Sequence, residues 1–465
     1  MTSGESTMEV TGRHETPRAP GTPSERAVLD ELKRGGPASR PQLASRTGLS
    51  KPTVASVLRK LEDAGLVRPA GQSSRGRGRS ALVFDYQPSA GYVAGIHIGH
   101  SWIRCAVADL VGTVVARNDV QNTARSASTV VSTVSRVAHE LARSAGIAWS
   151  QVVRTTVGSP GVFDPADGTL LLASRIRRWG RPGLIMELRR ELGEMTTIAN
   201  DANLAAVGEL TAGHHPSATT FVYLMVGTGV GMGIVIDGKL HSGSRGAAGE
   251  LAFLPFAEEG APRPRAFGRR WGSFEEAASA RGVVSTAVEL GMSPRVSALQ
   301  VFDAARRGHP AARTAVEREA ERLATAIAAV AAVVDPELVI LGGGIGSELT
   351  LLRDPMERRI HQLTPFHPQV VVSDLGDEAV LLGAIATALE MAGEPVYGRP
   401  PAGETSPAGR FSLHAPSQPS PAASGPVAAG NGELEPHPRP AVDGDADHGR
   451  GGARPRTPRR VHASG

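Results

Sequence analysis

Residues 221–250 read FVYLMVGTGVGMGIVIDGKLHSGSRGAAGE, and this stretch decides the fold of the chain. Two apolar runs, 221–226 and 234–236, flank a turn in which every second residue is glycine. Such a pattern predicts a β-hairpin with a glycine-dense tip. Backbone N–H groups at this tip can approach an oxyanion closely because no Cβ blocks the way. A tight turn between two strands would produce the same pattern.

Three further motifs surround the predicted hairpin. The sequence Asn-Asp-Ala-Asn at 200–203 precedes it, Gly-Ala-Ala-Gly-Glu at 246–250 closes it, and Leu-Gly-Gly-Gly at 341–344 follows it. Strand-like runs alternate with helical patterns over 89–395, which indicates an α/β fold. Two similar strand-turn-strand starts, near residues 93 and 222, predict a duplicated core with a cleft between its halves.

The composition limits the class of protein. The 465 residues include a single cysteine, Cys105, which excludes an internal disulfide or a cysteine-rich zinc site and fits the reducing cytoplasm. No apolar run of about 18 residues predicts a membrane span, and the first residues lack the apolar core of a signal peptide. Residues 1–22 and 396–465 are rich in small residues and proline, and are predicted to be disordered.

The charge of the chain is unevenly distributed. Residues 23–86 contain 12 Lys and Arg against 6 Asp and Glu, a net charge of +6, whereas the whole chain carries +4. The remainder is therefore slightly acidic, at −2. A basic N-terminal segment of this size indicates a polyanionic partner, and nucleic acid is the first candidate.

Residues 23–88 carry the pattern of a winged helix-turn-helix domain. Ser24, Ser39 and Ser50 are placed to cap three successive helices, and a glycine turn precedes the third helix. Two short strand patterns then flank a basic loop at 73–80, which predicts a wing. The predicted DNA contacts come from the third helix and the wing: Ser50, Lys51, Thr53, Ser56, Arg59, Lys60, Arg75, Arg77 and Arg79.

These contacts are expected to divide by role. Residues near the start of the third helix would face base edges, while Arg59 and Lys60 are better placed for phosphates. The alternative is a three-helix interaction module whose charged face is simply solvated.

Taken together, residues 24–392 resemble the ROK family of bacterial sugar-responsive repressors and sugar kinases. The matching motifs are 159–161 (Ser-Pro-Gly), 200–203, 227–231, 246–250 and 341–344. The N-terminal helix-turn-helix is typical of the repressor branch. The resemblance implies an actin-like, two-lobed domain of the ribonuclease H-like type at 89–395, preceded by the winged helix domain.

The resemblance also implies roles for individual residues. Asn200 would hold sugar hydroxyls, Glu250 and Glu275 would accept hydrogen bonds from them, and Asp201 would occupy the general-base position of a kinase. Considered without the resemblance, Asp201 would be a helix cap and Glu275 a carboxylate at a helix start. The residual phosphate loop would comprise Gly227, Thr228, Gly229 and Gly231.

Departures from the family pattern argue against catalysis. The first phosphate loop of the family reads Asp-Ile-Gly-Gly-Thr, and here His97 and His100 replace its aspartate and its second glycine. Phosphoryl transfer depends on a metal and on a nucleotide cradle, so we expect no catalytic residue and no cofactor. Phe253 stands in place of the family's sugar-site and zinc-binding histidine, and the zinc cysteines are replaced near Ala266, Gly268 and Ser273. Because zinc needs four N or S ligands, no metal is expected.

The sequence thus predicts a DNA-binding transcriptional repressor that responds to a sugar or sugar phosphate without phosphorylating it. Its partners would be operator DNA, the small effector, and further copies of itself in a homodimer or a dimer of dimers. Two alternatives remain open. One is a sugar kinase fused to a DNA-binding domain, and the other is a regulator that answers to a protein partner, which Phe253 would favour.

Overall fold

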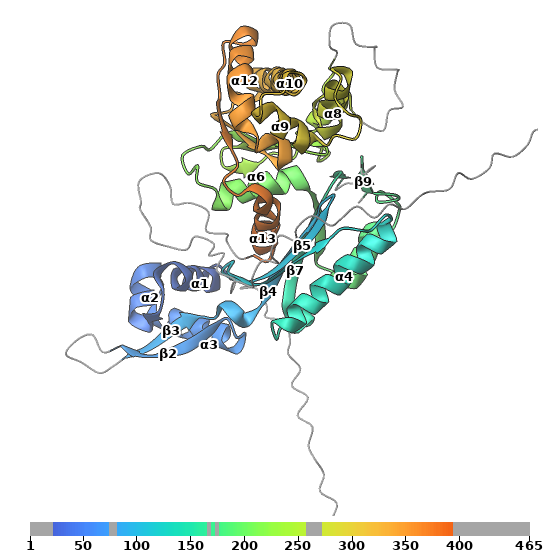
Figure 1. The fold of residues 1–465 in the computed structure, drawn as a ribbon. Coiled ribbons are helices and arrows are strands. Elements are labelled where there is room, and N and C mark those ends of the chain that lie inside the picture. The colour runs from blue at the N-terminus through green and yellow to red at the C-terminus, as the bar shows by residue number, and fades with distance from the viewer. Residues whose placement is uncertain (1–21, 74–80, 165–168, 173–175, 257–271, 394–465) are drawn as a thin grey trace, which may run out of the picture. The chain divides into compact units, whose positions relative to one another are not determined.

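The computed structural model describes residues 22–73, 81–164, 169–172, 176–256 and 272–393 (Figure 1). The two segments predicted to be disordered lie outside the described residues, apart from Thr22, and so does the wing loop with Arg75, Arg77 and Arg79. Within the described residues, no helix is both long and apolar enough to cross a membrane.

The N-terminal domain has the predicted winged helix architecture. Its hydrophobic core contains Val28, Leu43, Leu58 and Phe84, which come from all three helices and from the wing sheet. The sheet has the strand order β1-β3-β2. The elements are α1 (Pro23–Gly35), β1 (Ala38–Ser39), α2 (Arg40–Thr47), α3 (Lys51–Asp63), β2 (Val67–Ser73) and β3 (Ala81–Tyr86).

Capping of these helices follows the sequence signals with one correction. Ser50 caps α3, because its hydroxyl accepts a hydrogen bond from the Thr53 amide at 3.2 Å. The prediction that Ser24 caps α1 is wrong, since Thr22 caps it through a capping box with Glu25. Pro23 lacks an N–H and suits the first helical position, which places the cap one residue before it.

Two five-stranded sheets form the larger domain, and they share one topology. The strand orders are β10-β7-β4-β5-β6 and β13-β12-β11-β14-β15. In each sheet the first three strands in chain order pair antiparallel and the other two pair parallel, which confirms the predicted duplication. The strands are β4 (Tyr92–Ile98), β5 (Trp102–Asp109), β6 (Val114–Gln121), β7 (Val152–Ser159), β10 (Thr196–Asn200), β11 (Phe221–Val226), β12 (Val230–Ile236), β13 (Lys239–Leu240), β14 (Leu338–Gly342) and β15 (Gln369–Val372).

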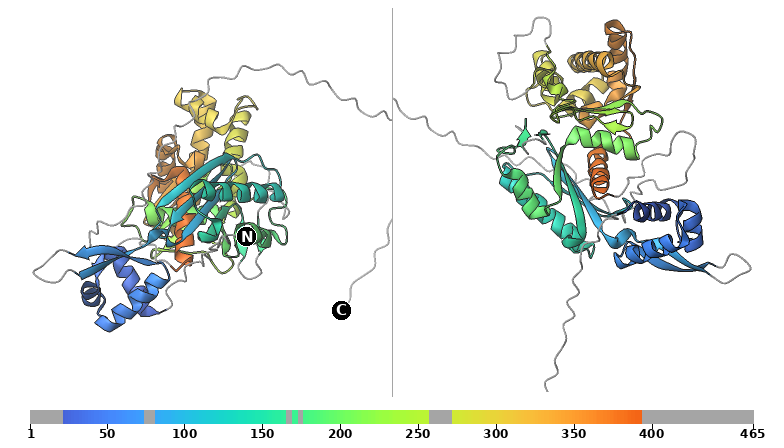
Figure 2. Two further views of the ribbon diagram at one scale, coloured as in Figure 1. Left: turned by 90° about the horizontal axis from the view of Figure 1, so that it is seen from below. Right: turned by 180° about the vertical axis from the view of Figure 1, so that it is seen from behind.

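Helices cover both faces of each sheet, as Figures 1 and 2 show. On the first sheet, α4 (Ala127–Ser144) and α5 (Leu184–Leu192) pack on the face that carries Ile96 and Ile98, and α13 (Ala379–Met391) packs on the other. On the second sheet, α6 (Asp201–Ala212) covers the face that carries Tyr223. The opposite face meets α7 (Ser273–Ala278), α8 (Ala280–Glu289), α9 (Ala298–Arg306), α10 (Pro310–Val334), α11 (Gly343–Gly346) and α12 (Leu349–Leu363).

Short elements complete the domain. A two-stranded ribbon joins β8 (Val162–Asp164) to β9 (Thr169–Leu171). The single turns are η1 (Pro88–Ala90), η2 (Trp149–Gln151), η3 (Leu251–Phe253) and η4 (Gly376–Glu378). Residues 273–289 do not form one continuous helix, because Ser279 adopts an extended conformation between α7 and α8.

The two halves of the domain meet where α6 crosses α13. A Cβ placed on Gly208 of α6 would lie 2.1 Å from the Ala379 carbonyl oxygen. One placed on Gly383 of α13 would lie 1.8 Å from the Leu204 carbonyl oxygen. No side chain fits at either point, so the two helix backbones are in direct contact.

We therefore expect Gly383→Ala to destabilise the protein by about 1–3 kcal/mol or more, because the added methyl must separate the helices. In an unhindered helix interior the same change would stabilise by about 1 kcal/mol. Denaturant unfolding measures the difference. Gly344→Ala in α11 is the control, since no atom lies within 4 Å of its Cβ position. Equal unfolding midpoints for the two variants would contradict the close crossing.

Candidate functional site

Three predicted sugar-binding carboxylates from separate segments influence one another electrostatically. Asp201 begins α6, Glu250 precedes η3, and Glu275 lies in the first turn of α7. Burial raises the pKa of the Glu250 carboxyl to about 7, and the negative charges of Asp201 and Glu275 add to the rise. The three groups are therefore close enough to interact electrostatically although they come from separate segments.

Asn200 and Asp201 also stabilise the backbone around them. The Asn200 side-chain oxygen caps α6 by accepting from the Asn203 amide at 3.1 Å, and its amide group donates to the Gly161 carbonyl at 3.1 Å. Asp201 accepts a hydrogen bond from the Ala202 amide at 2.9 Å. The contact with Gly161 connects the motifs 159–161 and 200–203, which the sequence only suggested to be related.

The glycine-rich turn at 227–231 packs against the glycine motif at 341–344. Gly343, which has a φ of 79°, lies so close to β11 that a Cβ there would be 2.5 Å from the Val226 carbonyl oxygen. At the turn itself the Gly227 amide donates to the Gly229 carbonyl at 2.9 Å. Glu275 accepts a hydrogen bond from the Val230 amide at 3.0 Å. One predicted sugar ligand thus also fixes the start of β12, directly after the turn that holds Gly227, Thr228 and Gly229.

The corresponding turn of the first sheet carries the substituted phosphate loop. His97 ends up beside Arg104, its cross-strand partner on β5. The pKa of His97 is lowered to about 4, chiefly by burial and also by the charge of Arg104, while Asp119 opposes the change. The ring is therefore neutral at pH 7, and its buried Nδ1 has no hydrogen-bond partner among the described residues. A neutral ring beside a guanidinium does not supply the negative charge that a metal–nucleotide complex needs.

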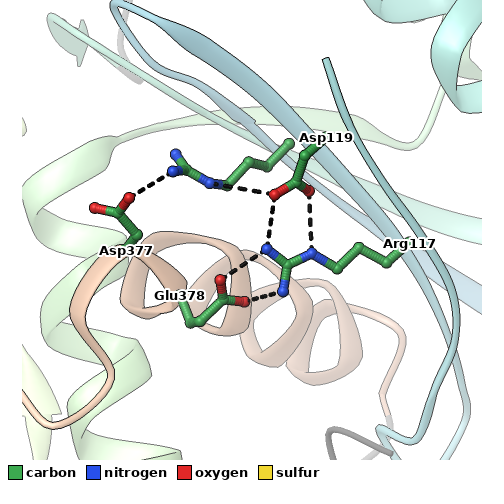
Figure 3. Close-up of polar contacts among 5 residues, drawn as sticks. Arg117, Asp119, Asp377 and Glu378 are labelled. Atoms are coloured by element: carbon green, nitrogen blue, oxygen red, sulfur yellow. Dashed lines mark hydrogen bonds and ion pairs between the residues drawn. The ribbon is translucent and has the colours of Figure 1, made fainter. Parts of the chain in front are cut away.

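Two arginines and three carboxylates form an ion-pair network between the first sheet and the residues that begin α13 (Figure 3). Arg104 of β5 contacts Asp377 at 2.6 Å and Asp119 of β6 at 3.6 Å. Arg117 of β6 contacts Asp119 at 2.8 Å and makes a bidentate pair with Glu378, with one N–O distance of 2.7 Å. These contacts raise the pKa of Arg117. The network joins the first sheet to the residues that begin α13.

Sequence reasoning missed this network. The sequence contains one sign of the network, the charged residue Arg104 in the strand 102–109. The residues around it in this strand, Ile103 and 105–108, are buried and apolar. An isolated charge of this kind requires a partner, but Asp377, the carboxylate that lies nearest to Arg104, is 273 residues away in the chain.

The residues near Phe253 do not fit the zinc site of the related proteins. Phe253 itself is 42 % exposed and offers no metal ligand. The Ser273 hydroxyl donates to the Leu254 carbonyl at 2.9 Å and accepts from the Phe256 amide at 3.1 Å. A serine hydroxyl thus ties this segment to the start of α7 where a thiolate–zinc link would be expected. Ala266 and Gly268 lie outside the described residues.

On the predicted DNA face of α3, some side chains are exposed and others form hydrogen bonds or ion pairs within the domain. Lys51, Ser56 and Arg59 are exposed. The Ser50 and Thr53 hydroxyls lie 2.7 Å apart within the helix cap. Lys60 is 63 % exposed and forms an ion pair with Glu25 of α1 at 3.2 Å. Ser56 and Arg59 are therefore the side chains whose substitution disturbs the fewest contacts within the domain.

Comparisons with known proteins agree with this architecture. A sequence model of the ROK family matches residues 93–391, and one of the MarR family matches residues 22–80. The xylose repressor of Caldicellulosiruptor bescii is 26 % identical over 379 residues, covering 77 % of this chain and 94 % of the repressor. The glucokinase of Thermotoga maritima is 31 % identical over 254 residues, covering 51 % of this chain and 79 % of the kinase.

Among solved structures, a ROK family transcriptional regulator, a homolog of the E. coli MLC protein, has the same fold. It aligns with a TM-score of 0.63 at 22 % identity, covering 79 % of this chain and 97 % of the regulator. The alignment extends over more of the chain than the ROK match alone, so it supports the order of a winged helix domain followed by an actin-like domain.

The electrostatics of the acidic site can be tested by pH. Glu250 has an ordinary pKa of 4.5 that rises to about 7 on folding, so the native state holds a proton that the unfolded chain releases between these values. Wild-type stability therefore falls as pH rises through this window. The Glu250→Gln side chain does not titrate, so the variant lacks this pH dependence. The free energy of unfolding of the variant, minus that of wild type, should therefore rise by on the order of 3 kcal/mol from pH 4.5 to above pH 7. Thermal unfolding at several pH values measures this, with the exposed Glu321→Gln as control. A difference that does not change with pH would contradict the placement of Glu250.

Proposed function

The chain belongs to the ROK family, and from that premise we propose that it is a transcriptional repressor that binds operator DNA and releases or retains it in response to a sugar. The observation that carries the proposal is the union of two units in one chain. One is a winged helix domain with an exposed basic recognition helix, and the other is a sugar-kinase-like domain with three carboxylates in one site. Named relatives that span both units, such as the xylose repressor, are repressors.

The sugar site is the part of the kinase machinery that this chain retains. Asn200, Asp201, Glu250 and Glu275 offer acceptors for hydroxyl groups, and charge-assisted hydrogen bonds of this type are strong. A site of buried polar groups also discriminates against ligands that leave those groups unpaired. Phe253 adds an apolar surface where the related proteins have a histidine, so the preferred sugar should differ from theirs.

We further infer that the domain does not catalyse phosphoryl transfer. Neutral His97 and the Arg104 ion pairs occupy the position at which a kinase holds its metal-supporting aspartate. The repressor would act in the cytoplasm as a homodimer or a dimer of dimers. Its winged helix domains must then match half-sites about one helical turn, or a multiple of it, apart.

DNA recognition by α3 predicts two separable effects. Arg59→Ala should weaken binding to every sequence and reduce the salt dependence by about one phosphate contact, because an exposed guanidinium at this position neutralises backbone charge. Ser56→Ala should instead change base preference, by about 1–3 kcal/mol per lost contact. Fluorescence anisotropy with selected operators at several salt concentrations measures both. Arg143→Ala, on an exposed turn of α4, is the charge-matched control. If the DNA affinity of Arg59→Ala depends on salt concentration as steeply as that of wild type, α3 does not contact DNA through this residue.

Effector binding is tested by Asp201→Asn. The asparagine oxygen can keep the hydrogen bond to the Ala202 amide, so the fold and effector-free DNA binding should persist, while the sugar response weakens at least ten-fold. A thermal-shift screen against sugars and sugar phosphates first identifies the effector, since a ligand of the native state raises the melting temperature. Asp237→Asn, in the exposed turn after β12, is the control. An unchanged response, or ATP-dependent sugar phosphorylation that disappears in the Asp201 variant, would overturn the non-catalytic sensor.

A further inference from the structure

An arginine-lined hollow lies beside the start of α4 and shares no residue with the acidic site. Its volume is about 600 Å3, within the range of roughly 300–1,000 Å3 found for small-molecule sites. The residues that line it come from two segments, the first turn of α4 and the stretch before α5: Ser126, Ala127, Ser128, Arg177, Arg178, Arg181 and Pro182.

The charge of the hollow is strongly positive. Arg181 forms an ion pair with Glu187 of α5. Arg177 and Arg178 are exposed, and no ion pair or hydrogen bond engages either guanidinium within the described residues. Among the described residues, Glu187 is therefore the one carboxylate that pairs with any of the three guanidinium groups. The planar fork of arginine matches the oxygens of a phosphate group better than any other side chain.

The α4 side of the hollow supplies hydroxyl groups. Ser126 caps the helix, and its hydroxyl lies 3.1 Å from that of Ser128 and 2.9 Å from that of Thr129. Hydroxyls in such a cluster can reorient to donate to an anion. The N-terminal end of this 18-residue helix also carries partial positive charge, which adds to that of the arginines.

The arginine-bearing segment is held in place by the core. Trp179, between Arg178 and Arg181, is 1 % exposed, and its indole N–H donates to the Ser159 hydroxyl at 3.0 Å. On the other side the Ala127 amide donates to the Arg177 carbonyl at 3.0 Å, which fixes the segment against α4. Because the backbone is anchored on both sides, only the arginine side chains, and not the segment that carries them, must become ordered when a ligand binds.

We propose that this hollow binds a phosphate group, either as inorganic phosphate or as the phosphate ester of a small molecule. A phosphate carries close to two negative charges at pH 7 and several acceptor oxygens, which suits a site with exposed arginines and hydroxyl donors. A neutral sugar would gain nothing from the arginines. The site is additional to the acidic one, and it does not depend on DNA binding or on the response to a sugar.

Isothermal titration of the full chain with inorganic phosphate and with glucose 6-phosphate, at constant ionic strength, tests the proposal. Arg177→Gln/Arg178→Gln should weaken binding at least ten-fold, while Arg143→Gln/Arg318→Gln, the same charge change at two other exposed positions, should bind like wild type. Binding of both probes would show that the phosphate group suffices, and binding of the ester alone would show that the ester is the ligand.

Three results would overturn the proposal. The first is equal loss in the two double variants, which would show a general effect of charge. The second is no loss in Arg177→Gln/Arg178→Gln, or no binding of either probe to wild type. The third is binding of unphosphorylated glucose that the same variant abolishes, which would make the hollow a sugar site. Circular dichroism melting without ligand verifies that the variants are folded, and none of these readouts involves DNA.

Discussion

The direct contact between the backbones of α6 and α13 is the constraint on which the larger domain depends. Each helix packs on the inner face of one sheet, and the two helices cross at Gly208 and Gly383. Gly158 on β7 continues the same contact, because a Cβ there would lie 2.8 Å from Leu204 and 2.9 Å from Val380. With no side chains between the helices at the crossing, the halves have few ways to move other than by rotation about it. Packed interfaces of this kind favour discrete arrangements over continuous deformation.

The ion-pair network of Figure 3 restrains one side of that crossing. Asp377 is 74 % exposed and its pair with Arg104 contributes little by itself. Glu378 is only 24 % exposed and pairs with the two terminal guanidinium nitrogens of Arg117, which is a stronger and more directional contact. Both carboxylates also lie at the start of α13, where negative charge is favourable. The network thus orients α13 on the first sheet, next to the strand that carries His97.

The sequence predicted the fold wherever a pattern was local. The hairpin at 221–236, the three N-terminal helices and the long helix α10 all have periodic apolar residues and clear turn or cap signals. The helix α12 escaped prediction because Pro355 lies in its interior, and proline usually ends a helix. At the candidate site, the sequence motifs predicted each carboxylate separately. Their electrostatic coupling, the Arg104 network and the Trp179 anchor depend on contacts between separate segments, and apart from the isolated charge of Arg104 a single sequence contains no local signal for these.

The placement of the acidic site suggests how a ligand could act on DNA binding. Asn200 ends β10 of the first sheet and is bonded to Gly161, whereas Glu250 and Glu275 belong to segments that pack on the second sheet. A ligand that contacts both groups binds most tightly when they are at one particular separation. It therefore favours one rotation about the α6–α13 crossing, and only this differential affinity can shift the equilibrium. The ion pairs of Asp377 and Glu378 hold the start of α13 on the first sheet, so they also favour particular arrangements about this crossing.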